Sequence, residues 1–183
     1  MKVGVSHSRY IADRIATDLA NLSFLNLTKG LDVVVTKTEE LILNDLNNES
    51  ALEERVYEMM DEYEDEIENN FADERELFRM IKKKLAPQYN FILSFDDRFN
   101  SLSHQILDIL ILNELIEFRV SEIKVKSLIF KSIENYINDR FNVEDRVIER
   151  IKKYKRRLTV GTDEYQIMFQ KLYEDELRAK GSL

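Results

Sequence analysis

Two histidines are the side chains of this sequence whose type most readily supports metal binding or acid–base chemistry. His7 and His104 each come just before or within the first turn of a predicted helix, close to serines, and an imidazole titrates near neutral pH and binds metals. The sequence contains no Glu-x-x-His pair and no His-Glu-x-x-His motif, so two histidines alone do not complete a tetrahedral zinc set. We interpret both as surface residues at helix starts.

Five carboxylates in the segment Asp61–Glu66 are the next candidate, because clustered carboxylates bind calcium or magnesium. No EF-hand glycine follows them, and a helix spreads carboxylates around its axis rather than converging them on one ion. The serines and threonines lack a nucleophile elbow, and Gly161–Asp163 lacks the glycine and lysine spacing of a phosphate loop. We predict no enzyme activity, no catalytic residue, no cofactor and no metal.

The same acidic segment returns 91 residues later with its charges reversed. The acidic residues Asp61, Glu62, Glu64, Asp65 and Glu66 correspond to Lys152, Lys153, Lys155, Arg156 and Arg157. Residues 49–76 carry 2 basic and 13 acidic side chains, whereas residues 140–167 carry 8 basic and 5 acidic ones. Since the apolar pattern underneath is kept, we infer that a common fold carries a remade surface.

Composition limits the architecture that positions these residues. The chain has 183 residues, of which 44% are hydrophobic, enough for one ordinary core or two small ones. Only 4 glycines and 1 proline are present, so few tight turns are available and helices are favoured. The absence of cysteine excludes disulfides and thiolate zinc sites and fits a reducing cytoplasm.

Charge and hydropathy limit the partners. The net charge of −8 repels nucleic acid and anionic membranes as a whole, and the entire excess lies in the first half of the chain. No run of about 18 uncharged apolar residues occurs, so we expect neither a signal peptide nor a membrane span.

The chain repeats itself at an offset of 91, half of its length. The identical pairs are Asn47 and Asn138, Glu53 and Glu144, Arg55 and Arg146, Val56 and Val147, Glu58 and Glu149, Tyr63 and Tyr154, and Phe78 and Phe169. The first helices align only at an offset near 96, which predicts a longer loop around residues 26–32 in the first copy. The single proline, Pro87, marks the boundary, giving repeat 1 at residues 1–90 and repeat 2 at residues 91–183.

Each repeat is predicted to contain four helices. The first covers about residues 8–24 and 103–118, and its second copy has almost no polar face, so we predict that it is buried. Capping residues start the second helix at Thr36 and Ser121, and the third at Ser50 and near Asn142. The third and fourth helices carry thin apolar stripes, which include Leu52, Val56, Met60, Tyr63 and Ile67 in repeat 1 and Val143, Val147, Ile151, Tyr154 and Leu158 in repeat 2.

A helix with a thin stripe can bury it against only one or two neighbours, whereas a helix with a wide stripe needs several. We therefore predict an all-α, internally duplicated protein in which the first two helices of both repeats form one shared four-helix bundle. The last two helices of each repeat form a projecting arm. The acidic arm spans about residues 49–86, and the basic arm spans about residues 140–180.

Three segments carry a resemblance to a known family. They are ILNELIEF at Ile111–Phe118, NVEDRVIERIKKY at Asn142–Tyr154 and LFRMIKKKLA at Leu77–Ala86. Together with a serine-led first helix, they resemble the bacterial family called domain of unknown function 507, once per repeat and over nearly the whole chain. The resemblance implies an all-helical fold with a bundle base and helical arms, and it implies no activity, catalytic residue or ligand.

The charge inversion leaves three interpretations open. The arms could bind protein partners, including a second copy of the chain, through the acidic set and the basic set with Arg150. The basic arm could instead bind RNA phosphates. Alternatively, the two arms could pair only with each other inside one molecule, where exposed ion pairs contribute little. We predict the first, because the overall acidity disfavours the second and projecting arms disfavour the third.

Overall fold

The computed structural model describes residues 3–62, 73–154, 159 and 161–179, and these are predominantly helical. Contacts divide the chain into two compact units, Met1–Ile133 and Glu134–Leu183. The ordered elements are η1 (Val5–His7), α1 (Ser8–Ala20), β1 (Leu25–Leu27), α2 (Leu31–Glu62), α4 (Glu74–Leu85), η2 (Ala86–Tyr89), α5 (Phe95–Leu112), β2 (Ile116–Phe118), α6 (Glu122–Lys152) and α7 (Asp163–Ala179). The prediction of an all-α protein is confirmed.

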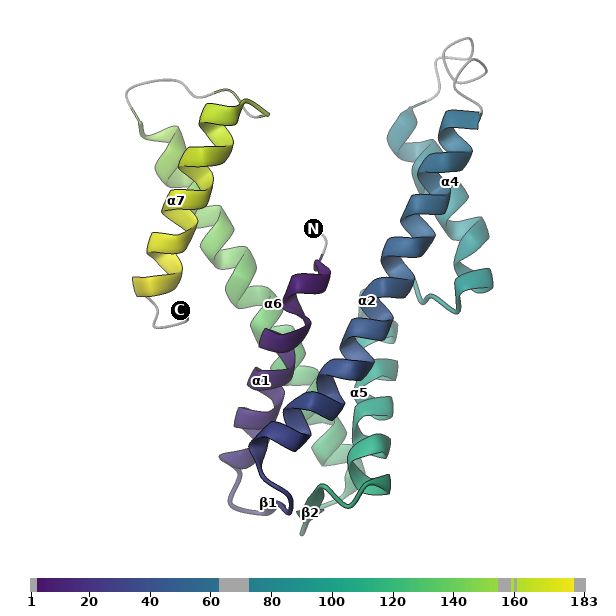
Figure 1. Cartoon of the computed structure of the whole chain (residues 1–183), viewed down its shortest axis with the longest axis vertical. Helices are drawn as coiled ribbons and strands as arrows, with labels where there is room; N and C mark the ends of the chain where they lie inside the picture. The colour runs from purple at the N-terminus through teal and green to yellow at the C-terminus, as the bar shows by residue number, and fades with distance from the viewer. Residues whose placement is uncertain (1–2, 63–72, 155–158, 160, 180–183) are drawn as a thin grey trace. The chain divides into compact units, whose positions relative to one another are not determined.

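The first unit is organised around α2, which packs against both α1 and α5 (Figure 1). On α1, the buried residues Ile11, Ile15 and Leu19 recur at a spacing of four, which places them on one helix face. The first turns of α6 also contribute buried residues to this unit, among them Val125 and Ile129. The buried side chains of this unit thus come from both halves of the sequence.

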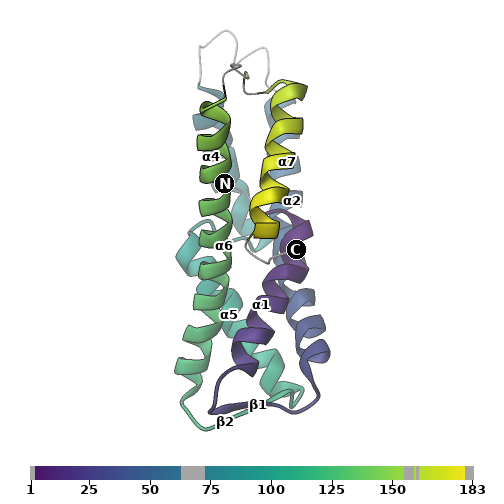
Figure 2. The ribbon, with the colours of Figure 1, turned by 90° about the vertical axis from the view of Figure 1, so that its left-hand side faces the viewer.

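A two-stranded antiparallel ribbon joins the ends of α1 and α5 (Figure 2). β1 pairs with β2 in the register Leu25↔Phe118 and Leu27↔Ile116. The prediction that residues 116–118 continue the first helix of repeat 2 is wrong. Helix α5 ends at Leu112, because Glu114 adopts a left-handed conformation with φ 52°, which an α-helix cannot contain.

The predicted second and third helices of each repeat are one continuous helix. α2 runs through Ser50, and α6 runs through Asn142, so the predicted breaks at these residues are wrong. The predicted start at Thr36 is also displaced, because α2 begins at Leu31 directly after Gly30 with its φ of 87°. Between residues 31 and 62 no glycine or proline interrupts the helix, and a serine there does not end it.

The helical hairpins predicted for the arms have the buried stripes that the sequence indicates. In the first unit, Leu52 and Val56 of the second half of α2 pack with Leu85 at the end of α4 and with Phe91. In the second unit, a cluster from α6 and α7 contains Val143, Val147, Ile151, Leu172 and Tyr173. Each stripe is therefore buried between the two helices of its own hairpin.

The described elements of the two repeats align at an offset of 91, the first helices included, so the expected offset near 96 for the first helices is wrong. The buried residues Ile11, Ile15 and Leu19 of α1 correspond to Leu102, Ile106 and Leu110 of α5, which are buried as well. Three residues follow each strand before the next helix begins, and the expected longer loop in the first copy is not found among these residues. α1 and α5 differ most at their exposed residues, and these differences hide the offset of 91 in the sequence.

The second copy of the first helix is buried over most of its apolar residues, but the prediction of burial is wrong at its end. Leu112 is 79% exposed and Ile111 is 37% exposed, both at the end of α5. The apolar residues of α5 exceed what its neighbours within the described part of the unit can cover.

Candidate functional site

The described residues of the predicted acidic and basic sets lie at the ends of two long helices. Asp61 and Glu62 form the end of α2 and are exposed. Arg150, Lys152 and Lys153 lie at the end of α6 and beyond it, and they are also exposed. The remaining members of the two sets, Glu64, Asp65, Glu66, Lys155, Arg156 and Arg157, lie outside the described residues.

Two of the basic residues have acidic partners within their own hairpin. Arg150 Nη1 lies 2.7 Å from Glu176 Oε1 of α7, and Lys152 Nζ lies 2.8 Å from Glu149 Oε1. The hydrogen bond from Lys152 lowers the pKa of Glu149, and the same bond raises the pKa of Lys152. The positive charge of this surface is thus partly balanced by carboxylates of the same hairpin.

Tyr154 does not occupy the apolar seam, contrary to the prediction. It is 47% exposed, because α6 ends at Lys152 and the chain turns directly afterwards, with the Tyr154 N–H donating to Ile151 O. Its counterpart Tyr63 lies outside the described residues.

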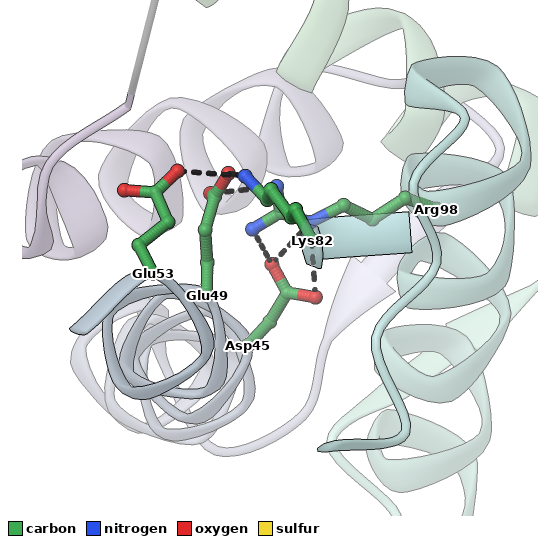
Figure 3. A network of polar contacts seen from close by, with 5 residues as sticks. All are labelled: Asp45, Glu49, Glu53, Lys82 and Arg98. Carbon is green, nitrogen blue, oxygen red and sulfur yellow. Dashed lines mark hydrogen bonds and ion pairs between the residues drawn. The ribbon is translucent and has the colours of Figure 1, made fainter. Parts of the chain in front are cut away.

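A network of partly buried ion pairs that the sequence analysis missed lies at the base of the first hairpin. Asp45, Glu49 and Glu53 are spaced four residues apart on α2, so they share one helix face. Figure 3 shows these three carboxylates with Lys82 of α4 and Arg98 of α5. Five charged side chains from three helices therefore meet at one point.

Glu49 is the centre of this network because each of its carboxylate oxygens accepts from a different cation. Lys82 Nζ donates to Glu49 Oε1 at 3.1 Å and to Glu53 Oε1 at 2.6 Å. Arg98 Nη1 donates to Glu49 Oε2 at 2.8 Å, and Arg98 Nε donates to Asp45 Oδ2 at 2.9 Å. The network thereby links α4 and α5 through α2.

Arg98 stays charged in spite of its burial. Burial disfavours the guanidinium, but hydrogen bonds and charge attraction from Asp45 and Glu49 outweigh it, so the pKa of Arg98 is raised. Both cations also contact the Phe91 ring, since Arg98 Cζ lies 4.4 Å and Lys82 Nζ lies 5.4 Å from its centroid. The arrangement is suited to holding α2, α4 and α5 together.

The corresponding position in the second hairpin carries different chemistry. At the offset of 91, Glu49 and Lys82 correspond to Arg140 and Tyr173. The Arg140 guanidinium lies 4.8 Å from the centroid of the Tyr173 ring, so a cation–π contact joins these two positions. The charge inversion therefore extends from the exposed residues to the inside of the hairpin.

The histidines do not occupy matching positions. His7 ends η1, before α1, whereas His104 lies in the middle of α5, so its prediction as a helix-start residue is wrong. The His104 Nε2 atom is 3.9 Å from the Asp108 carboxylate, and both side chains are exposed. Among the residues that the structure describes, no three His, Cys, Asp or Glu side chains are placed to hold a metal ion.

Comparisons with known proteins give the family. A family model described as "Protein of unknown function (DUF507)" matches residues 1–182, so one domain of this kind includes both repeats. No curated protein matches the chain. In the described part of the chain, none of the helices has the length and apolar content that crossing a membrane requires.

Proposed function

The chain belongs to the DUF507 family, whose description assigns no function, and from the geometry we propose that it is a non-enzymatic helical scaffold that binds protein partners through two oppositely charged arms. The acidic arm is the hairpin of α2 and α4, with Asp61 and Glu62 near its end. The basic arm is the hairpin of α6 and α7, with Arg150, Lys152 and Lys153.

The observation that carries this proposal is the change of surface charge over a buried seam that stays apolar. Leu52 and Val56 of the acidic arm correspond to Val143 and Val147 of the basic arm, and all four are buried. The exposed Asp61 corresponds to the exposed Lys152. Since folding of the hairpin depends on the seam, the surface charges are available to select partners.

Protein partners fit the basic arm better than nucleic acid does. Phosphate binding depends on cations that release counterions when they bind. Arg150 and Lys152 already contact Glu176 and Glu149, and a polyanion would compete with both carboxylates. A protein surface with mixed charges can complement such an arm without displacing these pairs.

The test reverses the basic arm in the full chain. Lys152, Lys153, Lys155, Arg156 and Arg157 are changed to glutamate, and a control carries Lys131→Glu, an exposed lysine of α6 outside the arm. Immobilised wild type and variants are compared for capture of proteins and of RNA from a bacterial lysate. We expect the arm variant to lose specific proteins that the wild type and the control retain.

Two results would contradict the proposal. RNA retained by the wild type, lost in the arm variant and steeply weakened by salt would identify a nucleic-acid module. The second result combines two observations. The arm variant captures every protein that the wild type captures, and reversing the acidic arm as well restores the free energy of unfolding that the basic-arm variant lost. The arms would then pair only with each other.

A further inference from the structure

An open groove lies on the first unit beside the exposed end of α5. It encloses about 580 Å³ and is lined by residues of α2, α5 and the start of α6. Its apolar lining comes from Leu41, Ile109, Ile111 and Leu112, and two carboxylates, Asp108 and Glu122, also line it. Both carboxylates are exposed, and the lining contains no basic residue among those described.

The fold does not require apolar residues on this face, as the matching face of α1 shows. At the offset of 91, Ile109 and Leu112 correspond to Asp18 and Asn21. On α1 that face carries the ion pair of Arg14 Nε and Asp18 Oδ2, 3.0 Å apart. Because the buried positions of α1 and α5 match while their exposed faces differ, the apolar face of α5 serves something other than the shared fold.

We propose that this groove binds an amphipathic helix of a protein partner, with lysine or arginine residues flanking its apolar stripe. The lining of α5 extends along two turns from Gln105 to Leu112, about 11 Å, which matches the span of anchors spaced three, four and seven residues apart on a bound helix. Its apolar part is the last turn, from Ile109 to Leu112. The carboxylates of Asp108 and Glu122 select a basic helix over an acidic one by charge complementarity. This site is separate from the arms and does not depend on their proposed role.

The experiment uses the full chain and two synthetic helical peptides of about 18 residues, long enough for five turns. Both peptides carry the same leucine stripe, flanked by lysines in one and by glutamates in the other, and binding is followed by fluorescence anisotropy. We expect the lysine peptide to bind at least ~10-fold more tightly than the glutamate peptide, a difference that shrinks as salt increases.

Variants test whether the groove is the binding site. Leu112→Ser should weaken binding of the lysine peptide at least ~10-fold. Ile167→Ser, which changes a residue of α7 that is 70% exposed against 79% for Leu112, should leave it unchanged. Asp108→Asn combined with Glu122→Gln should reduce the preference for the lysine peptide. Because Leu112 is exposed, circular dichroism should show that the Leu112→Ser chain folds like the wild type.

Three results would overturn the proposal: equal binding of both peptides, no binding of either, or binding that Leu112→Ser does not weaken. A fourth result that would overturn it comes from sedimentation equilibrium: a wild type that dimerises, a monomeric Leu112→Ser variant and no binding of either peptide. That combination would show that a second copy of the chain occupies the groove. Asp61→Lys with Glu62→Lys should not change the affinity for the lysine peptide. That variant separates a failure of the groove from a failure of the arms.

Discussion

Replacing Arg98 by methionine should lower the free energy of unfolding far more than removing an exposed charge would. The Arg98 side chain is 10% exposed, and its partners Asp45 and Glu49 are 21% and 12% exposed. Removing one partner of a buried ion pair costs about 3–5 kcal/mol, since the other charge remains buried. Because Lys82 still contacts Glu49 at 3.1 Å, we expect the lower end of that range, about 3 kcal/mol.

Glu49→Gln should cost less, although Glu49 is the centre of the network. After this change, Lys82 keeps Glu53 at 2.6 Å and Arg98 keeps Asp45 at 2.9 Å, so each cation still has a carboxylate. The loss then resembles weakened charge-assisted hydrogen bonds, about 1–2 kcal/mol. The control is Arg55→Met on the same helix, whose ion pairs with Glu58 and Glu62 are exposed and whose loss should not be measurable.

The measurement is urea unfolding followed by circular dichroism, because the chain contains no tryptophan. Hydrogen exchange of the amides of α4 provides a second readout, since the network ties α4 to α2. We expect Arg98→Met to be the least stable, Glu49→Gln to be intermediate and Arg55→Met to match the wild type. If Arg98→Met cost no more than Arg55→Met, the assignment of a stabilising role to the network would be refuted.

Three smaller predictions concern single side chains. Thr38→Val should keep or raise the free energy of unfolding, by up to about 1 kcal/mol, because the buried Thr38 hydroxyl has no hydrogen-bond partner within the described residues; thermal melts that show a loss above that amount would contradict this. Burial raises the pKa of the Tyr173 phenol above its value of about 10 in the unfolded chain, so the free energy of unfolding should fall as the pH rises above about 10. In urea titrations, Tyr173→Phe should abolish that fall and should cost little at neutral pH. His104→Ala should change stability by less than about 0.5 kcal/mol and leave any zinc uptake, measured by calorimetry, unaffected, since its side chain is exposed.

Helical periodicity was enough to predict the buried part of the seam in each hairpin, although it wrongly placed Tyr154 there. Leu52 and Val56, like Val143 and Val147, are apolar residues spaced four apart within otherwise charged segments, a pattern that only a helix face explains. The helix boundaries were harder, because a capping signal is local. Ser50 followed by a glutamate three residues later has the same sequence whether a helix begins there or passes through.

The ribbon and the ion-pair network depend on contacts between distant residues. A strand of three residues such as Leu25–Leu27 is too short to show an alternating pattern, and its pairing with β2 joins residues about 91 positions apart. Within the network, the regular spacing of Asp45, Glu49 and Glu53 was visible in the sequence. What was not visible was that Lys82 and Arg98 return to the same face from two other helices.

The base of each hairpin explains why the exposed charges call for a partner outside the fold. Glu49 and its counterpart Arg140 carry opposite charges and face inward, and the residue that each contacts differs as well. Glu49 pairs with Lys82 in one hairpin, whereas Arg140 stacks on Tyr173 in the other. Folding therefore constrains the charge at that position through a second residue of the same hairpin. Asp61 and its counterpart Lys152 are exposed, and the buried seam places no such condition on their sign. Their opposite charges are better explained by selection for what each arm contacts than by selection for folding.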